Sequence, residues 1–151
     1  MKILKIKDKE VMINATMKKI AIITQKNKGK NLKDTFFKAQ YEVNFLYLAQ
    51  IIMNLSETED GKNAFNGDIN KVYDFMEQWV EFNKKDYQEL FKIIAEEIND
   101  KSFFGKKLTA EEMKELMENP LASFDMNQVI EKTAQSVLGE AVAEEWRGYR
   151  G

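Results

Sequence analysis

The sequence contains no cysteine and no histidine, and it has a single proline among its 151 residues. These absences exclude the usual near-neutral general base, a thiol nucleophile, a Ser-His-Asp triad and zinc sites built from His and Cys. The lack of cysteine also fits a reducing compartment. A chain of this length can bury roughly 68–70% of its unfolded surface, so its core needs no disulfides.

The chain also lacks both common phosphate-binding patterns, GxxxxGK[ST] and GxGxxG. Carboxylates remain as possible catalytic groups, and they gather in two helical segments: Glu96, Glu97 and Asp100, then Glu111, Glu112 and Glu115. Each set falls opposite an apolar stripe, where charged residues are expected to be solvated. The sequence therefore predicts a protein that is not an enzyme and that binds no metal and no cofactor.

Long hydrophobic runs are missing as well. The stretch VNFLYLAQIIM, residues 43–53, carries no charge but has only eleven residues, whereas a helix that spans a membrane needs about 20. The first ten residues, MKILKIKDKE, alternate lysine with apolar residues instead of showing the continuous apolar run of a signal peptide. We therefore expect no membrane association and a cytoplasmic location.

Charge is distributed unevenly along the chain. Residues 1–38 hold eleven lysines and three acidic residues, a net charge of +8, and the remainder holds 12 basic and 22 acidic residues, a net charge of −10. A solubilising face is the preferred interpretation of these lysines, since lysine on an exposed strand discourages aggregation. An acidic protein partner and nucleic acid are the alternatives. The only two arginines, Arg147 and Arg150, lie at the far end, which argues against sequence-specific DNA reading.

Periodicity predicts a β-hairpin followed by helices. The segments KILKI and VMINA alternate as two short strands over residues 1–15. Apolar residues at helical spacing predict helices over residues 16–29, 36–55, 69–82, 87–100, 110–118 and 126–146. Thr16 and Asp68 are suitable N-caps, Gly29 is a stop, and Thr109 with Glu112 forms a capping box. The short separation of the helices at 69–82 and 87–100 predicts an antiparallel helical hairpin.

The helix over residues 36–55 is expected to lie at the centre of the fold. One apolar stripe contains Phe36, Phe37, Tyr41, Phe45, Leu48, Ile52 and Leu55. Most of the other side is apolar too, so the helix should be buried on several sides, with partial exposure to a partner as the alternative. The predicted fold is mainly α, a helical bundle around this helix with a short N-terminal β-hairpin, on the border of α+β. One domain, 1–151, would comprise the hairpin (1–15), a helical body (16–101) and a C-terminal helical extension (102–151).

Three aromatic residues are candidate partner contacts. Phe103 and Phe104 form a pair between two predicted helices, and Trp146 lies near the C-terminus. The pair is expected to anchor its loop to the core, but an exposed pair would bind a partner. We retain Phe103, Phe104 and Trp146 as the predicted partner-binding residues.

The order of the elements resembles a known family. A short basic hairpin (MKILKIKDKEVMINAT), a small helix, a long apolar helix and the segment DINKVYDFMEQWVEFNKKDYQELFKIIAEEINDK resemble the tail assembly chaperones of long-tailed phages of Gram-positive bacteria, over residues 1–101. The resemblance implies a phage or prophage protein that binds the tape-measure protein and helps to recruit tail-tube subunits. A homo-oligomer remains open. The alternative function is a small nucleic-acid-associated regulatory protein that uses the Lys-rich N-terminal region.

Overall fold

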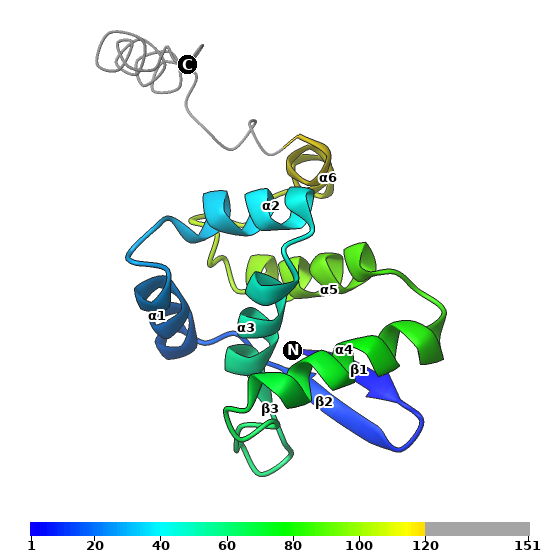
Figure 1. Cartoon of the computed structure of the whole chain (residues 1–151). Coiled ribbons are helices and arrows are strands. Elements are labelled where there is room, and N and C mark those ends of the chain that lie inside the picture. Colours follow the sequence, from blue (N-terminus) through cyan, green and yellow to red (C-terminus); the bar gives the residue numbers. More distant parts are fainter. Residues whose placement is uncertain (120–151) are drawn as a thin grey trace, which may run out of the picture. The chain divides into compact units, whose positions relative to one another are not determined.

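The computed structural model describes residues 1–119, which form a mainly helical fold with a small antiparallel sheet (Figure 1). The strands are β1 (Lys2–Ile6), β2 (Lys9–Ile13) and β3 (Ser56–Glu57), in the sheet order β1-β2-β3. The described helices are α1 (Met17–Lys26), α2 (Leu32–Glu42), α3 (Phe45–Leu55), α4 (Ile69–Asn83), α5 (Tyr87–Asp100) and α6 (Ala110–Glu118). The predicted fold class, mainly α with an N-terminal hairpin, is confirmed.

The hairpin buries one of its faces. Its inner face consists of Leu4, Ile6, Val11 and Ile13. The outer face carries apolar surface as well as lysine, because Ile3 lies there beside Lys5 and is 57% exposed. β3, which pairs with the end of β2, was not predicted. Its two residues are too few to show an alternating pattern.

The prediction of one helix over residues 36–55 is wrong, because the chain breaks at Val43 and Asn44. Val43 has φ 52° and ψ 56°, in the left-handed region. The N–H of Asn44 donates to the carbonyl of Ala39 at 2.8 Å, as in a Schellman helix end. Asn44 then begins α3, since its side-chain oxygen accepts from the N–H of Tyr47 at 3.0 Å. One residue pair thus ends one helix and starts the next.

The second of these helices, α3, is the centre of the fold. It packs against α1, α2, α4 and β2, and it runs through the middle of the view in Figure 1. Its buried residues are Tyr47, Leu48, Ala49, Ile51, Ile52 and Leu55. Beside it, the fully buried ring of Phe36 contacts four other rings, those of Phe37, Tyr47, Phe91 and Phe104. The prediction of a central apolar helix is therefore confirmed for its C-terminal half.

Three helix starts follow the predicted caps, whereas the helix predicted from residue 36 begins at Leu32, after the N-cap Asn31. Thr16 accepts from the N–H of Lys19 at 3.3 Å, and Asp68 accepts from the N–H of Asn70 at 3.0 Å. The capping box forms as expected: the Thr109 hydroxyl accepts from the N–H of Glu112 at 3.1 Å, and the Glu112 carboxylate accepts from the N–H of Thr109 at 3.0 Å.

The folded body extends beyond residue 101, where the sequence placed its end. The Asn99 side chain donates to the carbonyl of Leu108 at 2.9 Å and accepts from its N–H at 2.7 Å, so the loop after α5 is tied down. α6 packs against α2. The chain divides into two units, Met1–Glu118 and Asn119–Gly151. The predicted helix at 126–146 lies outside the described residues, and the single domain over 1–151 stays a prediction.

The C-terminal end of α4 offers a test of backbone strain. Lys84 is exposed and adopts φ 53° and ψ 47°, a conformation that costs an L-residue roughly 1–2 kcal/mol and glycine little. We expect Lys84→Gly to raise the free energy of unfolding by about 0.5–1 kcal/mol, measured by urea denaturation. Lys85→Gly is the matched control, because its φ is not positive, and it should lower stability. If K84G is less stable than the wild type, the assignment of Lys84 to the left-handed region is wrong.

Candidate protein-binding surface

The structure describes two of the three predicted partner residues, Phe103 and Phe104. Phe104 is 5% exposed, and its ring lies 5.7 Å from that of Phe36 and 5.1 Å from that of Phe37. Phe103 is partly buried and packs against the same core. Phe104 therefore anchors its loop to the core, the first of the two interpretations that the sequence left open. Trp146 lies outside the described residues.

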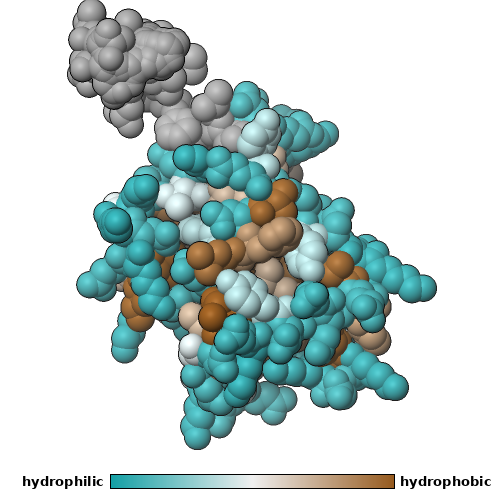
Figure 2. Space-filling view, in the orientation of Figure 1, coloured by the Kyte–Doolittle hydropathy of each residue, from teal (hydrophilic) through white to brown (hydrophobic). Residues whose placement is uncertain are grey.

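An apolar surface lies instead at the junction between α2 and α3. Tyr41 is 61% exposed, Phe45 47% and Leu46 52%, so three of the eight exposed large hydrophobic residues in the described part lie within six positions. We call these three residues the junction surface. Figure 2 shows apolar area in the middle of this face of the molecule, with hydrophilic residues around it. Large apolar side chains exposed this close together in the chain make the junction a candidate interaction site.

The junction surface also corrects a sequence prediction. Tyr41 and Phe45 belong to the stripe expected to be buried, and both are exposed. The stripe assumed an unbroken helix, and the break at Val43 and Asn44 changes the direction of the chain between them. Asn44 was the available signal, because asparagine is among the best N-cap residues.

A small pocket opens beside Phe45. It has a volume of about 270 Å³ and is lined by Phe45, Tyr73, Met76, Glu77 and Tyr87. The predicted pairing of α4 with α5 is not the main packing of these two helices, because the main contacts of α4 are with α3 and β1, and those of α5 are with β1. We call this cavity the junction pocket. Its volume is just below the ~300–1,000 Å³ of small-molecule sites.

Residues that line the pocket are fixed in place by burial and by contacts with each other. Met76 is only 2% exposed, and the rings of Phe45 and Tyr87 meet edge to face with centroids 4.9 Å apart. Gln40 of α2 donates to the side chain of Gln88 of α5 at 2.6 Å, and Gln88 donates back to the Gln40 carbonyl at 3.0 Å. These contacts join α2, α3, α4 and α5 around the pocket, so its shape exists before any partner arrives.

One of the carboxylates considered for catalysis, Glu97, was expected to be solvated; it is instead buried and serves the fold. Glu97 is fully buried, with one oxygen 2.8 Å from the Met1 α-ammonium and the other 3.0 Å from Lys101 Nζ. The second oxygen also accepts from the N–H of Ala15 at 2.8 Å. Burial alone would raise the pKa of Glu97, but these donors outweigh it and hold the pKa below its ordinary value. The carboxylate is therefore ionised, and both of its oxygens already have partners within the fold.

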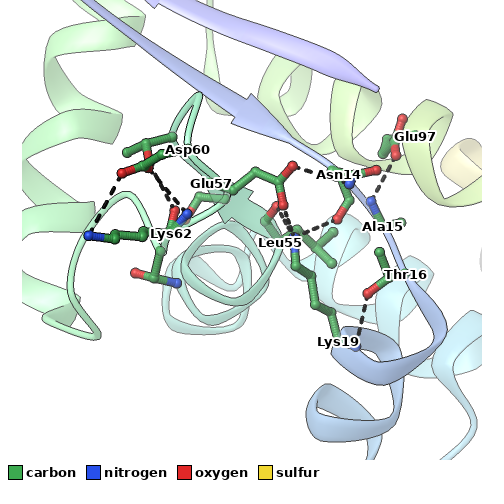
Figure 3. Close-up of polar contacts among 12 residues, drawn as sticks. Asn14, Ala15, Thr16, Lys19, Leu55, Glu57, Asp60, Lys62 and Glu97 are labelled. Atoms are coloured by element: carbon green, nitrogen blue, oxygen red, sulfur yellow. Dashed lines mark hydrogen bonds and ion pairs between the residues drawn. The ribbon is translucent and has the colours of Figure 1, made fainter.

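A second polar cluster joins the sheet to two helices (Figure 3). The Lys19 ammonium donates to the carbonyl of Asn14 at 3.0 Å, to the carbonyl of Leu55 at 3.3 Å and to the Glu57 carboxylate at 2.8 Å. The hydrogen bond from Lys19 is the main reason that the pKa of Glu57 is lowered. Each acceptor thus has a structural partner, and the cluster ties α1 to the end of α3.

Residues 1–119 contain neither a group of side chains that could hold a metal ion nor a helix that could span a membrane. Within residues 1–119, His, Cys, Asp and Glu side chains do not gather in groups of three or more that could hold a metal ion. Over the same residues, every helix is too short or too polar to cross a membrane.

Comparison with protein-family models, with curated proteins and with solved structures finds no match to this chain. Its function must therefore be inferred from the surface described above and from the resemblance in its sequence.

Proposed function

We propose that this protein is a non-enzymatic tail assembly chaperone of a long-tailed phage or prophage, which binds the tape-measure protein and helps to recruit tail-tube subunits. The observation that carries the binding role is the exposure of Tyr41, Phe45 and Leu46 beside a preformed apolar pocket. The resemblance of residues 1–101 supports the identity of the partner. The location that follows is the host cytoplasm.

The junction surface is suited to reversible binding of an apolar stripe on a partner helix. A long tape-measure helix exposes apolar stripes before the tail assembles, and such stripes aggregate unless they are covered. A small protein that offers exposed aromatic and aliphatic side chains can bind them by helix-in-groove contact. Because the surface is small, each contact is weak enough to be released when tail-tube subunits arrive.

The lysines of the N-terminal region do not favour the alternative, nucleic-acid binding. Lys2 pairs with Asp100, Lys5 with Glu10, and Lys19 with Glu57. A fourth lysine, Lys9, lies 4.9 Å from the ring centroid of Phe65. Four of the eleven lysines in residues 1–38 thus have a charged or aromatic partner within the molecule, and they are spread over the sheet and α1.

Co-expression tests the proposal directly. We expect the full chain to raise the soluble fraction of the tape-measure protein encoded beside it and to co-purify with that protein. The double variant Tyr41→Ser/Leu46→Ser should weaken this binding at least about tenfold, because buried anchors at interfaces typically contribute 2 kcal/mol or more. Affinity is measured by titration calorimetry with the purified proteins.

The matched control is Phe82→Ser. Phe82 is 52% exposed but does not belong to the junction surface or line the junction pocket, so this variant should bind like the wild type. Thermal unfolding of all variants shows whether the fold is kept. A tape-measure protein that is neither solubilised nor bound would remove the proposed function.

A further inference from the structure

The junction pocket has the dimensions of a site for one side chain. At about 270 Å³ it is lined mostly by apolar groups, and its walls come from α3, α4 and α5. A cofactor or drug-sized ligand needs more volume and several converging polar groups. A single aromatic or large aliphatic side chain is instead the usual anchor at protein interfaces.

One charged group marks the rim of this pocket. Glu77 is exposed and lines the opening, and it makes no ion pair or side-chain hydrogen bond with any of residues 1–119. Burial raises the pKa of the Tyr87 hydroxyl, and the negative charge of Glu77 raises it further. The carboxylate therefore projects its field onto the pocket wall, and a cation placed there would be stabilised.

A second copy of this chain is a poor occupant. In a symmetric dimer each subunit uses the same surface, so two junction pockets that faced each other across the symmetry axis would bring both Glu77 carboxylates together. Like charges at an interface are unfavourable. A helix with a basic residue next to its anchor has the complementary charge.

We propose that the junction pocket receives one large apolar side chain from a partner helix that carries Lys or Arg one helical turn away, where it pairs with Glu77. Positions i and i+4 of a helix lie on the same face, so the anchor and the cation can engage together. The cation would also lie close to the rings of Tyr73 and Tyr87, which line the pocket. This inference rests on the proposed function and specifies which part of the tape-measure helix is bound.

Synthetic peptides test this recognition with the full chain. The probe is a soluble helical peptide with one Trp and a Lys four residues later, and two matched peptides replace the Lys with Glu or the Trp with Ala. Fluorescence anisotropy should show the Trp/Lys peptide binding about fivefold tighter than the Trp/Glu peptide at low salt, since exposed ion pairs contribute modestly. The Trp-to-Ala peptide should bind at least tenfold more weakly than the Trp/Lys peptide.

Charge reversal in the protein completes the test. Glu77→Lys should invert the preference between the Lys and Glu peptides, whereas Glu59→Lys, the same charge change in an exposed residue that does not line this pocket, should leave it unchanged. Equal binding of both peptides, or an unaltered preference in E77K, would overturn the inference. So would self-association of the wild type that the Trp/Lys peptide reverses, because a second copy would then be the occupant of the pocket.

The two proposals fail in different ways. If the chain binds the tape-measure protein and E77K binds it equally well, the proposed recognition is wrong and the chaperone function stands. If the peptide preference appears but the tape-measure protein is not bound, the recognition stands and the choice of partner is wrong.

Discussion

Replacing Phe36 with alanine is expected to lower the free energy of unfolding by about 4 kcal/mol. Phe36 is fully buried, and its ring lies 5.4–6.3 Å from those of Phe37, Tyr47, Phe91 and Phe104. Removing it loses the transfer free energy of the ring and leaves a cavity among four rigid neighbours, and such changes cost about 3–5 kcal/mol. Urea denaturation with a common slope measures the difference.

The control for Phe36→Ala is Phe82→Ala. Phe82 is half exposed, and a surface substitution of this kind should change stability by about 0.5 kcal/mol or less. A loss below about 1.5 kcal/mol in F36A would mean that α2, α3, α5 and the loop after α5, which carry these rings, do not meet around Phe36 in solution.

Replacing Glu97 with alanine is expected to lower the free energy of unfolding by about 3 kcal/mol at neutral pH. The change leaves Lys101 and the Met1 ammonium without their shared partner and the N–H of Ala15 without its acceptor. Breaking a buried ion pair costs about 3–5 kcal/mol, and the two cations are partly exposed, so the lower end applies. Glu97→Gln keeps the shape and should lose less.

The contacts of Glu97 also predict that the free energy of unfolding depends on pH. The pKa of Glu97 is lower in the folded chain than its ordinary value of 4.5, so the unfolded state binds more protons near that pH. Its contribution to stability is therefore complete above pH 4.5 and is lost as the pH falls through the folded-state pKa. Denaturation between pH 3 and pH 6 should show a shallower acid loss in E97Q than in the wild type.

The control for the pH dependence is Glu96→Gln, which removes a neighbouring carboxylate without an ion pair among residues 1–119. If E97Q loses stability with falling pH as steeply as the wild type, Glu97 is not the group responsible.

Local signals in the sequence predicted most of the helix ends, because caps depend on a few neighbouring residues. Thr16, Asp68 and the Thr109–Glu112 box all form as expected. The break at Val43 was missed because a β-branched residue is a poor choice for the left-handed region. There the tertiary fold overrides the local preference, and only Asn44 marked the start of a new helix.

The junction surface was missed as a consequence of this break, since periodicity assigns faces only along an unbroken helix. Tyr41 and Phe45 share a stripe in the sequence, but they belong to two helices. The junction pocket depends on Tyr73 and Tyr87, which come from two further helices. Contacts of this kind follow from packing between distant segments, and one sequence does not reveal them.

The Glu97 contacts also have a consequence for the order of folding during synthesis. Ala15 and Glu97 are 82 positions apart, so the ribosome releases the hairpin long before the carboxylate that secures it. An isolated hairpin is at best marginally stable, and a nascent chain folds only with the segments already made. The contact between the hairpin and Glu97 can thus form only after α5 has left the exit tunnel.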